Sequence, residues 1–284
     1  MLKEFYQSIM KYKIYYSGKV NMGDRLNKDM LEEMFNVQVE KGDRFNSNMI
    51  AIGSGLASAL WSNYPVVKAK QIMKYPFLSR DFHVWGTGFI KHAEKDKSFY
   101  FKNVIFHCLR GQLTKERVEK IIGKKLDIPL GDGGLLAERW VKEPPKKYSV
   151  GIIPHFKEQD HPLIQSLKEH YNNSTVIDLT ENPKDVVRKI AECEFILSSS
   201  LHGLIVADSF HIPNMHVLFY KMGERIRGDG YKFEDYYSSY GLKDNPRMIS
   251  TDSFPDLDEI LNKYSIRKDD VEIKKEQLIN AFPL

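Results

Sequence analysis

The sequence predicts an α/β fold with two doubly wound, Rossmann-like domains that face each other across a cleft in a GT-B-like arrangement. Short apolar runs alternate with amphipathic stretches along the chain, which is typical of βαβ units. A Pro- and Lys-rich break over residues 142–147 interrupts this alternation, which then begins again. We therefore expect an N-terminal domain over residues 1–143 and a C-terminal domain over residues 148–284, whose last helix is placed to pack back on the N-terminal domain.

Four apolar runs in the first half predict strands, and each is followed by a turn of small or polar residues. The strands are expected over residues 13–16, 49–52, 83–85 and 104–108. Helices are expected over residues 24–35, with Asp24 as the N-cap, and over residues 113–122. The turns therefore lie at the carboxyl ends of parallel strands, where open α/β sheets bind ligands.

The same pattern predicts four strands and three helices after the break, and two helices in the tail. The strands cover residues 149–153, 175–179, 195–197 and 214–219. The helices cover residues 161–171, 183–192, 201–210, 256–264 and 269–282. The second domain is therefore expected to present its own set of strand ends to the cleft.

Composition limits the kinds of partner. The 284 residues are 42% hydrophobic and carry a formal net charge of +4, as in a folded, mildly basic protein. This balance suits phosphorylated or sugar-acid ligands and allows peripheral contact with an anionic membrane, but it is too weak to predict nucleic-acid binding.

Cys108 and Cys193 are far apart, which indicates a reducing compartment. No apolar run could span a bilayer and the first residues lack a signal-peptide core, so we expect a cytoplasmic location or one at the inner face of the membrane.

The strongest chemical signal is an apolar strand that runs into three serines and then into a helix. The residues of this helix start would form a seat for a phosphate or an oxyanion, and they are Ser198, Ser199, Ser200, Leu201 and Gly203. His202, in the first turn, would donate a hydrogen bond to the phosphate or transfer a proton. The sequence is equally consistent with serines that only cap the helix and with His202 as a satisfied polar residue.

Two turns of the first half predict an acceptor-binding side. The candidates for contact with sugar hydroxyls are Asn21, Gly23, Asn27, Gly86 and Thr87. Asp24, in the first of these turns, is a catalytic candidate. The alternative for the first turn is a plain helix cap and turn. The glycines at 86–88, like those at 53–55, resemble a phosphate loop but complete neither a dinucleotide nor a Walker A fingerprint.

Several cationic or ionisable residues complete the predicted donor side. Arg110 follows a strand directly, where it would clamp a carboxylate or a phosphate; an exposed salt bridge is the alternative. His155 ends the first strand of the second half and either faces the cleft or belongs to a structural turn. Lys221 begins a Gly-rich loop with Arg225 and Arg227 that would close over an anionic donor or remain solvated. The spacing of His and Cys predicts no metal site, and no cofactor is expected.

Taken in order, these segments resemble the polysaccharide pyruvyl transferase family, and most closely its exopolysaccharide ketal-pyruvate transferases. The resemblance extends from about residue 13 to residue 241, and it depends on the order and spacing of the segments. They are Asn21-x-Gly23-Asp24-x-Leu26-Asn27, Ala51-Ile52-Gly53-Ser54-Gly55, Trp85-Gly86-Thr87-Gly88, Leu109-Arg110-Gly111-x-Leu113-Thr114, Gly151-x-x-Pro154-His155 and the run from Ser198 to Asp208.

The resemblance implies a GT-B-like fold and the transfer of pyruvate from phosphoenolpyruvate, as co-substrate, onto two hydroxyls of a sugar as a ketal. It implies that Arg110 and the helix start hold the donor and that His202 is the general acid. Many relatives carry Arg-Leu-His in this helix start, whereas Ser200 stands here in place of the Arg. Either Lys221, Arg225 or Arg227 replaces that cation or the donor differs. The acceptor sugar, and whether it is free, nucleotide-linked or lipid-linked, is left open, as is the oligomeric state.

Two other functions compete with this prediction. A GT-B nucleotide-sugar-dependent glycosyltransferase of polysaccharide synthesis would use the same helix start for a diphosphate. A non-catalytic carbohydrate-binding subunit is disfavoured, because Asp24, Arg110 and His202 are all present.

Overall fold

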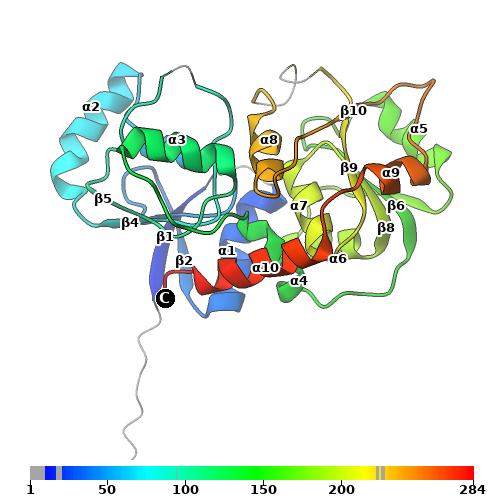
Figure 1. Ribbon diagram of the computed structural model, residues 1–284, viewed down its shortest axis with the longest axis horizontal. Helices are drawn as coiled ribbons and strands as arrows, with labels where there is room; N and C mark the ends of the chain where they lie inside the picture. Colours follow the sequence, from blue (N-terminus) through cyan, green and yellow to red (C-terminus); the bar gives the residue numbers. More distant parts are fainter. Residues whose placement is uncertain (1–9, 17–20, 94, 222–223, 225–227) are drawn as a thin grey trace, which may run out of the picture.

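The computed structural model describes residues 10–16, 21–93, 95–221, 224 and 228–284, which form two parallel five-stranded sheets (Figure 1). The first sheet has the order β2-β1-β3-β4-β5 and the second β10-β9-β8-β6-β7, so both have the same topology when counted from their own first strand. This is a doubly wound order. The predicted α/β class with two Rossmann-like units agrees with these sheets, and GT-B-like docking across a cleft stays a prediction.

The strands are short and lie close to the predicted runs. In the first sheet they are β1 Lys11–Tyr15, β2 Gln38–Gly42, β3 Met49–Ile50, β4 Asp81–Val84 and β5 Asn103–Phe106. In the second they are β6 Tyr148–Ile153, β7 Ser174–Val176, β8 Cys193–Ser198, β9 Asn214–Leu218 and β10 Arg247–Met248. Both β2 and β10 lie at sheet edges and were not predicted, since β2 is half polar and β10 has two residues.

Helices connect these strands on both faces of each sheet. The α-helices are α1 Met22–Phe35, α2 Pro65–Lys74, α3 Gln112–Ile122, α4 Ala137–Trp140, α5 Pro162–His170, α6 Pro183–Ala191, α7 Leu201–Ser209, α8 Tyr231–Ser238, α9 Leu257–Lys263 and α10 Lys268–Asn280. The short 3₁₀-helices are η1 Leu56–Ala59, η2 Tyr75–Phe77 and η3 Gly133–Leu136. Within the described ranges, no helix is long and apolar enough to cross a bilayer.

The predicted start of α1 was wrong by two residues. The N-cap is Asn21, whose Oδ1 accepts a hydrogen bond from the Gly23 amide at 3.2 Å, and Asp24 lies inside the first turn. Asp and Asn are comparable caps, and an acidic residue in the first turn is favourable as well. The local pattern therefore could not separate the two positions.

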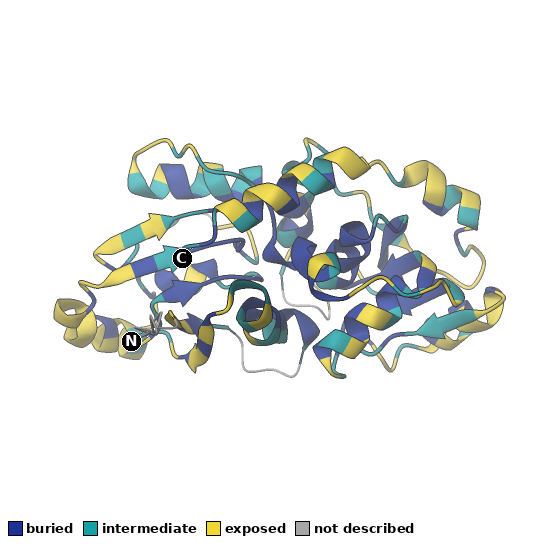
Figure 2. Cartoon of the chain, turned by 90° about the horizontal axis from the view of Figure 1, so that it is seen from below, coloured by how far each residue is buried: buried dark blue, intermediate teal, exposed yellow. Residues whose placement is uncertain are grey.

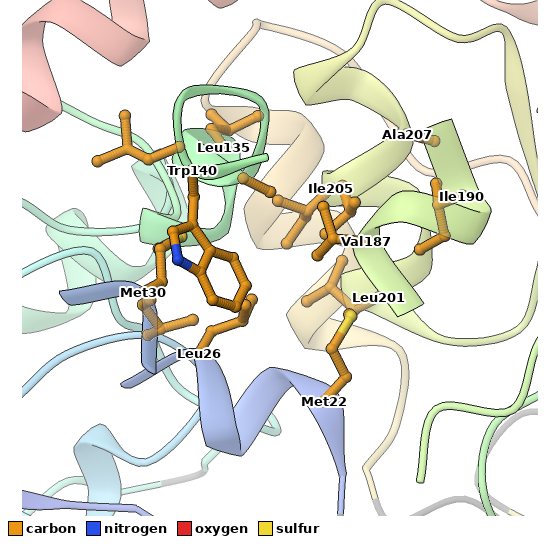
Figure 3. Packing of buried hydrophobic residues seen from close by; sticks show 14 of the residues in the cluster. Met22, Leu26, Met30, Leu135, Trp140, Val187, Ile190, Leu201, Ile205 and Ala207 are labelled. Carbon is orange, nitrogen blue, oxygen red and sulfur yellow. The ribbon is translucent and has the colours of Figure 1, made fainter. Parts of the chain in front are cut away.

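One hydrophobic core extends through both units. It joins Met22 and Met30 of α1 and Trp140 of α4 to Val187 of α6 and Ile205 of α7 (Figure 3). Figure 2 shows buried segments continuing through the middle of the molecule, where the two units meet. The units are therefore packed against each other and not only linked by residues 142–147.

Helix α10 crosses this junction and ends on the first unit (Figure 1). The carbonyl oxygen of Leu278 accepts a hydrogen bond of 3.0 Å from Trp85 Nε1. Beyond the helix, Phe282 stacks on Phe35 with 3.7 Å between ring centroids. The C-terminal segment therefore adds to the cohesion of the two units.

Candidate functional site

The carboxyl ends of strands from both sheets meet at the junction of the units. In each sheet the second strand (β2 or β7) lies on one side of the first strand (β1 or β6), and the third strand (β3 or β8) lies on its other side. Such switch points are where open α/β sheets bind ligands. Helix α1 follows β1 and helix α7 follows β8, and their starts lie together, with Met22 next to Leu201 (Figure 3).

Helix α7 begins without a side-chain cap. Ser200 occupies the N-cap position, but its hydroxyl accepts no hydrogen bond from the helix. Within the described part of the chain, the amides of Leu201 and His202 also have no acceptor. These N–H groups and the positive end of the helix dipole are therefore available to an anion.

The other two serines have protein partners. Ser198 Oγ accepts from the Ser200 amide at 3.0 Å and donates to a backbone carbonyl. Ser199 Oγ donates to Glu158 Oε2 at 2.6 Å and accepts from the amide of His155 at 2.9 Å. In this conformation Ser198, Ser199 and His155 join β8 to the segment after β6, and their contact with a donor stays a prediction.

The imidazole of His202 lies in a cage of glycines from the first unit. A methyl group added at Gly23 would lie only 2.1 Å from His202 Nδ1. At Gly134 it would lie 3.6 Å from Cδ2, and at Gly53, where φ is +111°, it would lie 4.0 Å from Cε1. These glycines permit the close approach of the ring, and any side chain at position 23 would displace it.

His202 also lacks a hydrogen-bond partner at Nε2, which is buried. Burial lowers the pKa of His202 to about 3, with the charges of Lys232 and Arg110 acting in the same direction. The imidazole is therefore neutral at pH 7 in the absence of a ligand. Its nearest acidic atom is Oδ1 of Asp132, 4.0 Å from Nε2.

Asp132 is completely buried in the turn before η3. Its Oδ1 accepts a hydrogen bond of 2.9 Å from the Gly134 amide, while Oδ2 has no partner. Burial raises the pKa of Asp132 to about 7, although Arg110 and the Gly134 amide oppose this shift. Asp132 is not among the candidates selected from the sequence, so it is a functional candidate that only the structure reveals.

Arg110 is also completely buried, which the sequence did not predict. Its Nε donates to Asp235 Oδ2 at 2.8 Å, across the junction. The terminal nitrogens donate to Ser54 Oγ at 2.6 Å and to the carbonyl oxygen of Phe89 at 2.6 Å. The predicted alternative of an exposed salt bridge was wrong, because this ion pair has no exposed side-chain surface. A direct contact of Arg110 with the donor stays a prediction.

The predicted acceptor residues hold the turns of the first unit together. Asn27 is buried, and its Nδ2 donates to the carbonyl oxygen of Ile52 at 3.0 Å. Thr87 Oγ1 donates to the carbonyl oxygen of Gly53 at 2.9 Å. Gly86 has a φ of +62°, and a methyl group there would lie 2.8 Å from the Gly133 amide nitrogen. Contact of these residues with a sugar stays a prediction, as does the catalytic role of Asp24.

Comparison with known proteins identifies the family. The profile of polysaccharide pyruvyl transferases matches residues 3–218 of the chain. The chain belongs to this family.

Three individual proteins are similar to this family member. Protein L143 of Acanthamoeba polyphaga mimivirus is 28% identical over 237 residues, which are 81% of this chain and 74% of L143. The succinoglycan biosynthesis protein ExoV of Rhizobium meliloti is 29% identical over 104 residues, 37% of this chain and 31% of ExoV. A crystal structure of an uncharacterised Klebsiella pneumoniae protein matches 86% of this chain and 93% of its own, with 13% identity and a TM-score of 0.44.

Membership in the polysaccharide pyruvyl transferases supports a transferase role, with pyruvyl transfer in polysaccharide biosynthesis. It leaves open which residue supplies the positive charge at Ser200, where many members carry an Arg. Lys221 is exposed, and Arg225 and Arg227 lie outside the described residues. Helix α8 reaches the junction through Asp235, and it also carries a cation, Lys232.

Lys232 is partly buried and has no hydrogen-bond or ion-pair partner among the described residues. Burial, together with the charge of Arg110, lowers its pKa to about 8, and the charge of Glu158 opposes this shift. The charge of Lys232 in turn lowers the pKa of His202. The sequence analysis did not select Lys232, which lies on α8 beyond residue 218, where the family match ends.

Proposed function

We propose that the protein transfers pyruvate from phosphoenolpyruvate onto two hydroxyls of a sugar, forming a ketal in a bacterial-type surface polysaccharide or its precursor. The observation that supports the proposal is the start of α7, which has no side-chain cap and carries the imidazole of His202, whose buried Nε2 has no hydrogen-bond partner. Family membership and the similarity to a succinoglycan biosynthesis protein support the polysaccharide context.

Phosphoenolpyruvate is a small, multiply charged anion, and the junction offers N–H groups and cations that would bind it. The free amides of Leu201 and His202 would bind phosphate oxygens at the positive end of α7. Lys232 would supply the full positive charge that Ser200 does not, and ion pairing with the ligand would offset the cost of its burial. The positive charge of Arg110 would attract the same anion without contact. Arg110 would bind it directly if it gave up one of its hydrogen bonds to the protein.

His202 is the proposed general acid. A bound phosphate raises the pKa of a neighbouring imidazole, because a negative charge favours the imidazolium. Proton transfer from His202 to the methylene carbon of phosphoenolpyruvate uses the electron pair of the carbon–carbon double bond and leaves an oxocarbenium-like carbon. One sugar hydroxyl adds to this carbon and loses its proton. Phosphate leaves with the electron pair of its carbon–oxygen bond, and the second hydroxyl adds and loses its proton.

Asp132 is the proposed positioning residue for His202. Its unpaired carboxyl oxygen and the unpaired Nε2 of His202 are buried near each other, and a small movement on ligand binding would bring them into hydrogen-bond contact. Because the pKa of Asp132 is raised to about 7, this carboxyl can hold a proton at neutral pH and return it to Nε2.

The test is the melting temperature of the protein with phosphoenolpyruvate, measured in parallel with a panel of nucleotide sugars. A ligand that binds only the folded state raises the melting temperature. We expect a rise with phosphoenolpyruvate that is smaller in Lys232→Gln, followed by release of inorganic phosphate when a suitable sugar is added. Binding of nucleotide sugars without any response to phosphoenolpyruvate would refute the proposal.

Nucleotide-sugar-dependent glycosyl transfer is the second candidate, and one observation favours it. Ser200 removes a cation from the helix start, and an uncapped helix N-terminus is equally suited to a diphosphate. The ligand panel separates the two candidates.

A further inference from the structure

Exposed apolar side chains are concentrated on one helix of the first unit. Of twelve large hydrophobic side chains that are exposed in the described ranges, six belong to residues 64–77. They are Tyr64 (75% exposed), Val66 (70%), Ile72 (56%), Met73 (71%), Tyr75 (39%) and Phe77 (77%). The other six are scattered over the chain, so α2 and the 3₁₀-turn η2 that follows it form the main exposed apolar patch.

Helix α2 is oriented in the opposite way to an ordinary surface helix. A surface helix buries its apolar side and exposes its polar side. In α2 the buried residue is Gln71, whose Oε1 accepts from the Ser62 amide at 2.8 Å and whose Nε2 donates to the Leu60 carbonyl oxygen at 3.1 Å. These two bonds fix Gln71 as the buried residue of the helix, and Val66, Ile72 and Met73 remain exposed.

The charges around this apolar side are all of one sign. Residues 61–80 contain three lysines and one arginine, and no acidic residue. At 3.6 residues per turn, Val66, Ala69, Ile72 and Met73 share the outward face opposite Gln71. Lys68 lies on one flank of this face, and Lys70 and Lys74 lie on the other. Lysine stems can lie along an apolar surface while their ammonium groups reach outward.

We propose that α2 and η2 dock the protein on an anionic bilayer surface, with the apolar face in the headgroup region and the lysines on acidic lipids. An apolar helix face flanked by cations is the pattern of helices that lie in a membrane interface. A symmetric contact between two copies would bring two patches that both carry only positive charges against each other, which is unfavourable. Helix α2 lies at the outer end of the first unit, away from the second (Figure 1), so docking there leaves the junction free.

The test is co-sedimentation of the full chain with vesicles of phosphatidylcholine alone and of phosphatidylcholine mixed with phosphatidylglycerol. We expect binding to the mixed vesicles only, and weaker binding as salt is added. The variant Lys68→Gln/Lys70→Gln/Lys74→Gln should bind about a hundredfold more weakly, from about 1 kcal/mol per lysine. The variant Ile72→Ser/Met73→Ser/Phe77→Ser should lose sedimentation with the vesicles.

Matched controls come from other surfaces of the same chain. Leu261→Ser/Ile273→Ser removes side chains of similar exposure, 52% and 56%, and Lys120→Gln/Lys124→Gln removes two exposed cations of and near α3. Both controls should bind as the parent does, with unchanged circular dichroism. The proposal is overturned if the parent binds neither vesicle, if it binds both equally, or if the controls lose binding as the α2 variants do. It is also overturned if α2 instead mediates self-association, seen as a dimer in analytical ultracentrifugation that the α2 variants abolish.

Discussion

Among the pairs of ionisable side chains that meet across the junction, Arg110–Asp235 and His202–Asp132 differ in how completely they are hydrogen-bonded. Arg110 of the first unit meets Asp235 of the second at 2.8 Å, with Ser54 and Phe89 as further partners of the guanidinium. His202 of the second unit faces Asp132 of the first at 4.0 Å, and one polar atom of each has no partner. Both pairs are buried.

This difference indicates that Arg110–Asp235 is a structural pair, whereas His202 and Asp132 keep polar atoms that a ligand would bind. A buried charge is tolerated when it is paired and hydrogen-bonded, and Arg110 meets both conditions without a ligand. Buried polar atoms without partners are costly and rare, so the open positions of His202 and Asp132 are a candidate place for substrate atoms or for a closer contact. The comparison therefore predicts that changes at His202 and Asp132 affect catalysis, whereas changes at Arg110 affect stability first.

The largest expected effect is on the rate when the ring of His202 is lost or displaced. His202→Ala should lower kcat about 10²- to 10⁴-fold, the usual contribution of a general acid. Gly23→Ala should have a comparable effect, because its methyl group would lie 2.1 Å from Nδ1. Steady-state rates of pyruvyl transfer measure both changes.

The double variant Gly23→Ala/His202→Ala provides the control. Once the imidazole is absent, the added methyl group has nothing to displace, so the double variant should be no slower than His202→Ala. An additive loss of rate would show that Gly23 acts independently of the ring.

The next largest expected effect is on the free energy of unfolding of Arg110 variants. Arg110→Ala should lower the free energy of unfolding by about 3–5 kcal/mol, because it leaves the carboxylate of Asp235 buried without its ion-pair partner. Arg110→Met/Asp235→Asn should recover most of this loss, since it removes both charges and keeps an acceptor for the Thr114 amide. Urea denaturation measures these differences.

An exposed ion pair serves as the reference for the Arg110 variants. Arg188 pairs with Asp185 at 2.7 Å, with side chains 49% and 55% exposed. Arg188→Ala should cost less than about 1 kcal/mol. If Arg110→Ala were equally mild, the interpretation of Arg110–Asp235 as the structural pair would be wrong.

The third effect is on the pH dependence. Because burial raises the pKa of Asp132 to about 7, the carboxyl is protonated below this pH, and kcat/KM should fall as the pH rises through about 7. Asp132→Asn should lower kcat and remove this alkaline limb. A limb that is unchanged in Asp132→Asn would assign the titration to another group, such as Lys232.

The same shift has a consequence for stability. The folded protein keeps the proton of Asp132 up to about pH 7, whereas the unfolded chain releases it near 3.8. The contribution of Asp132 to stability is therefore highest below about pH 4 and decreases as the pH rises to about 7. Asp132→Asn should flatten the dependence of the unfolding free energy on pH in this window.

The smallest effect is expected at Lys232. Lys232→Gln should raise KM for phosphoenolpyruvate about tenfold, the equivalent of about 1.4 kcal/mol, with little change in kcat. Lys221→Gln tests the cation that the sequence suggested in its place. A larger effect at Lys221 than at Lys232 would show that the Gly-rich loop, and not α8, supplies the cation for the donor.

The local elements of the fold were largely predictable from the sequence. The strands that end at Tyr15, Ile153 and Ser198 and the helices that follow them came from short-range hydrophobic periodicity and turn residues, which act over a few positions. His202 and the serines before it were identified in the same way, because a helix start after a buried strand is a local pattern. Edge strand β2 and helices α2 and α8 were not among the predicted elements; β2 is half polar and α8 is rich in aromatic residues.

The sequence by itself thus determined the two α/β units, the family and the position of His202 at the start of a helix. Only the tertiary structure decided that Arg110 is buried against a carboxylate 125 positions away and that Asp132 faces His202. The physical reason is that ion pairing and desolvation depend on which surfaces pack together. Residues far apart in the chain form these contacts, and no short-range pattern records them.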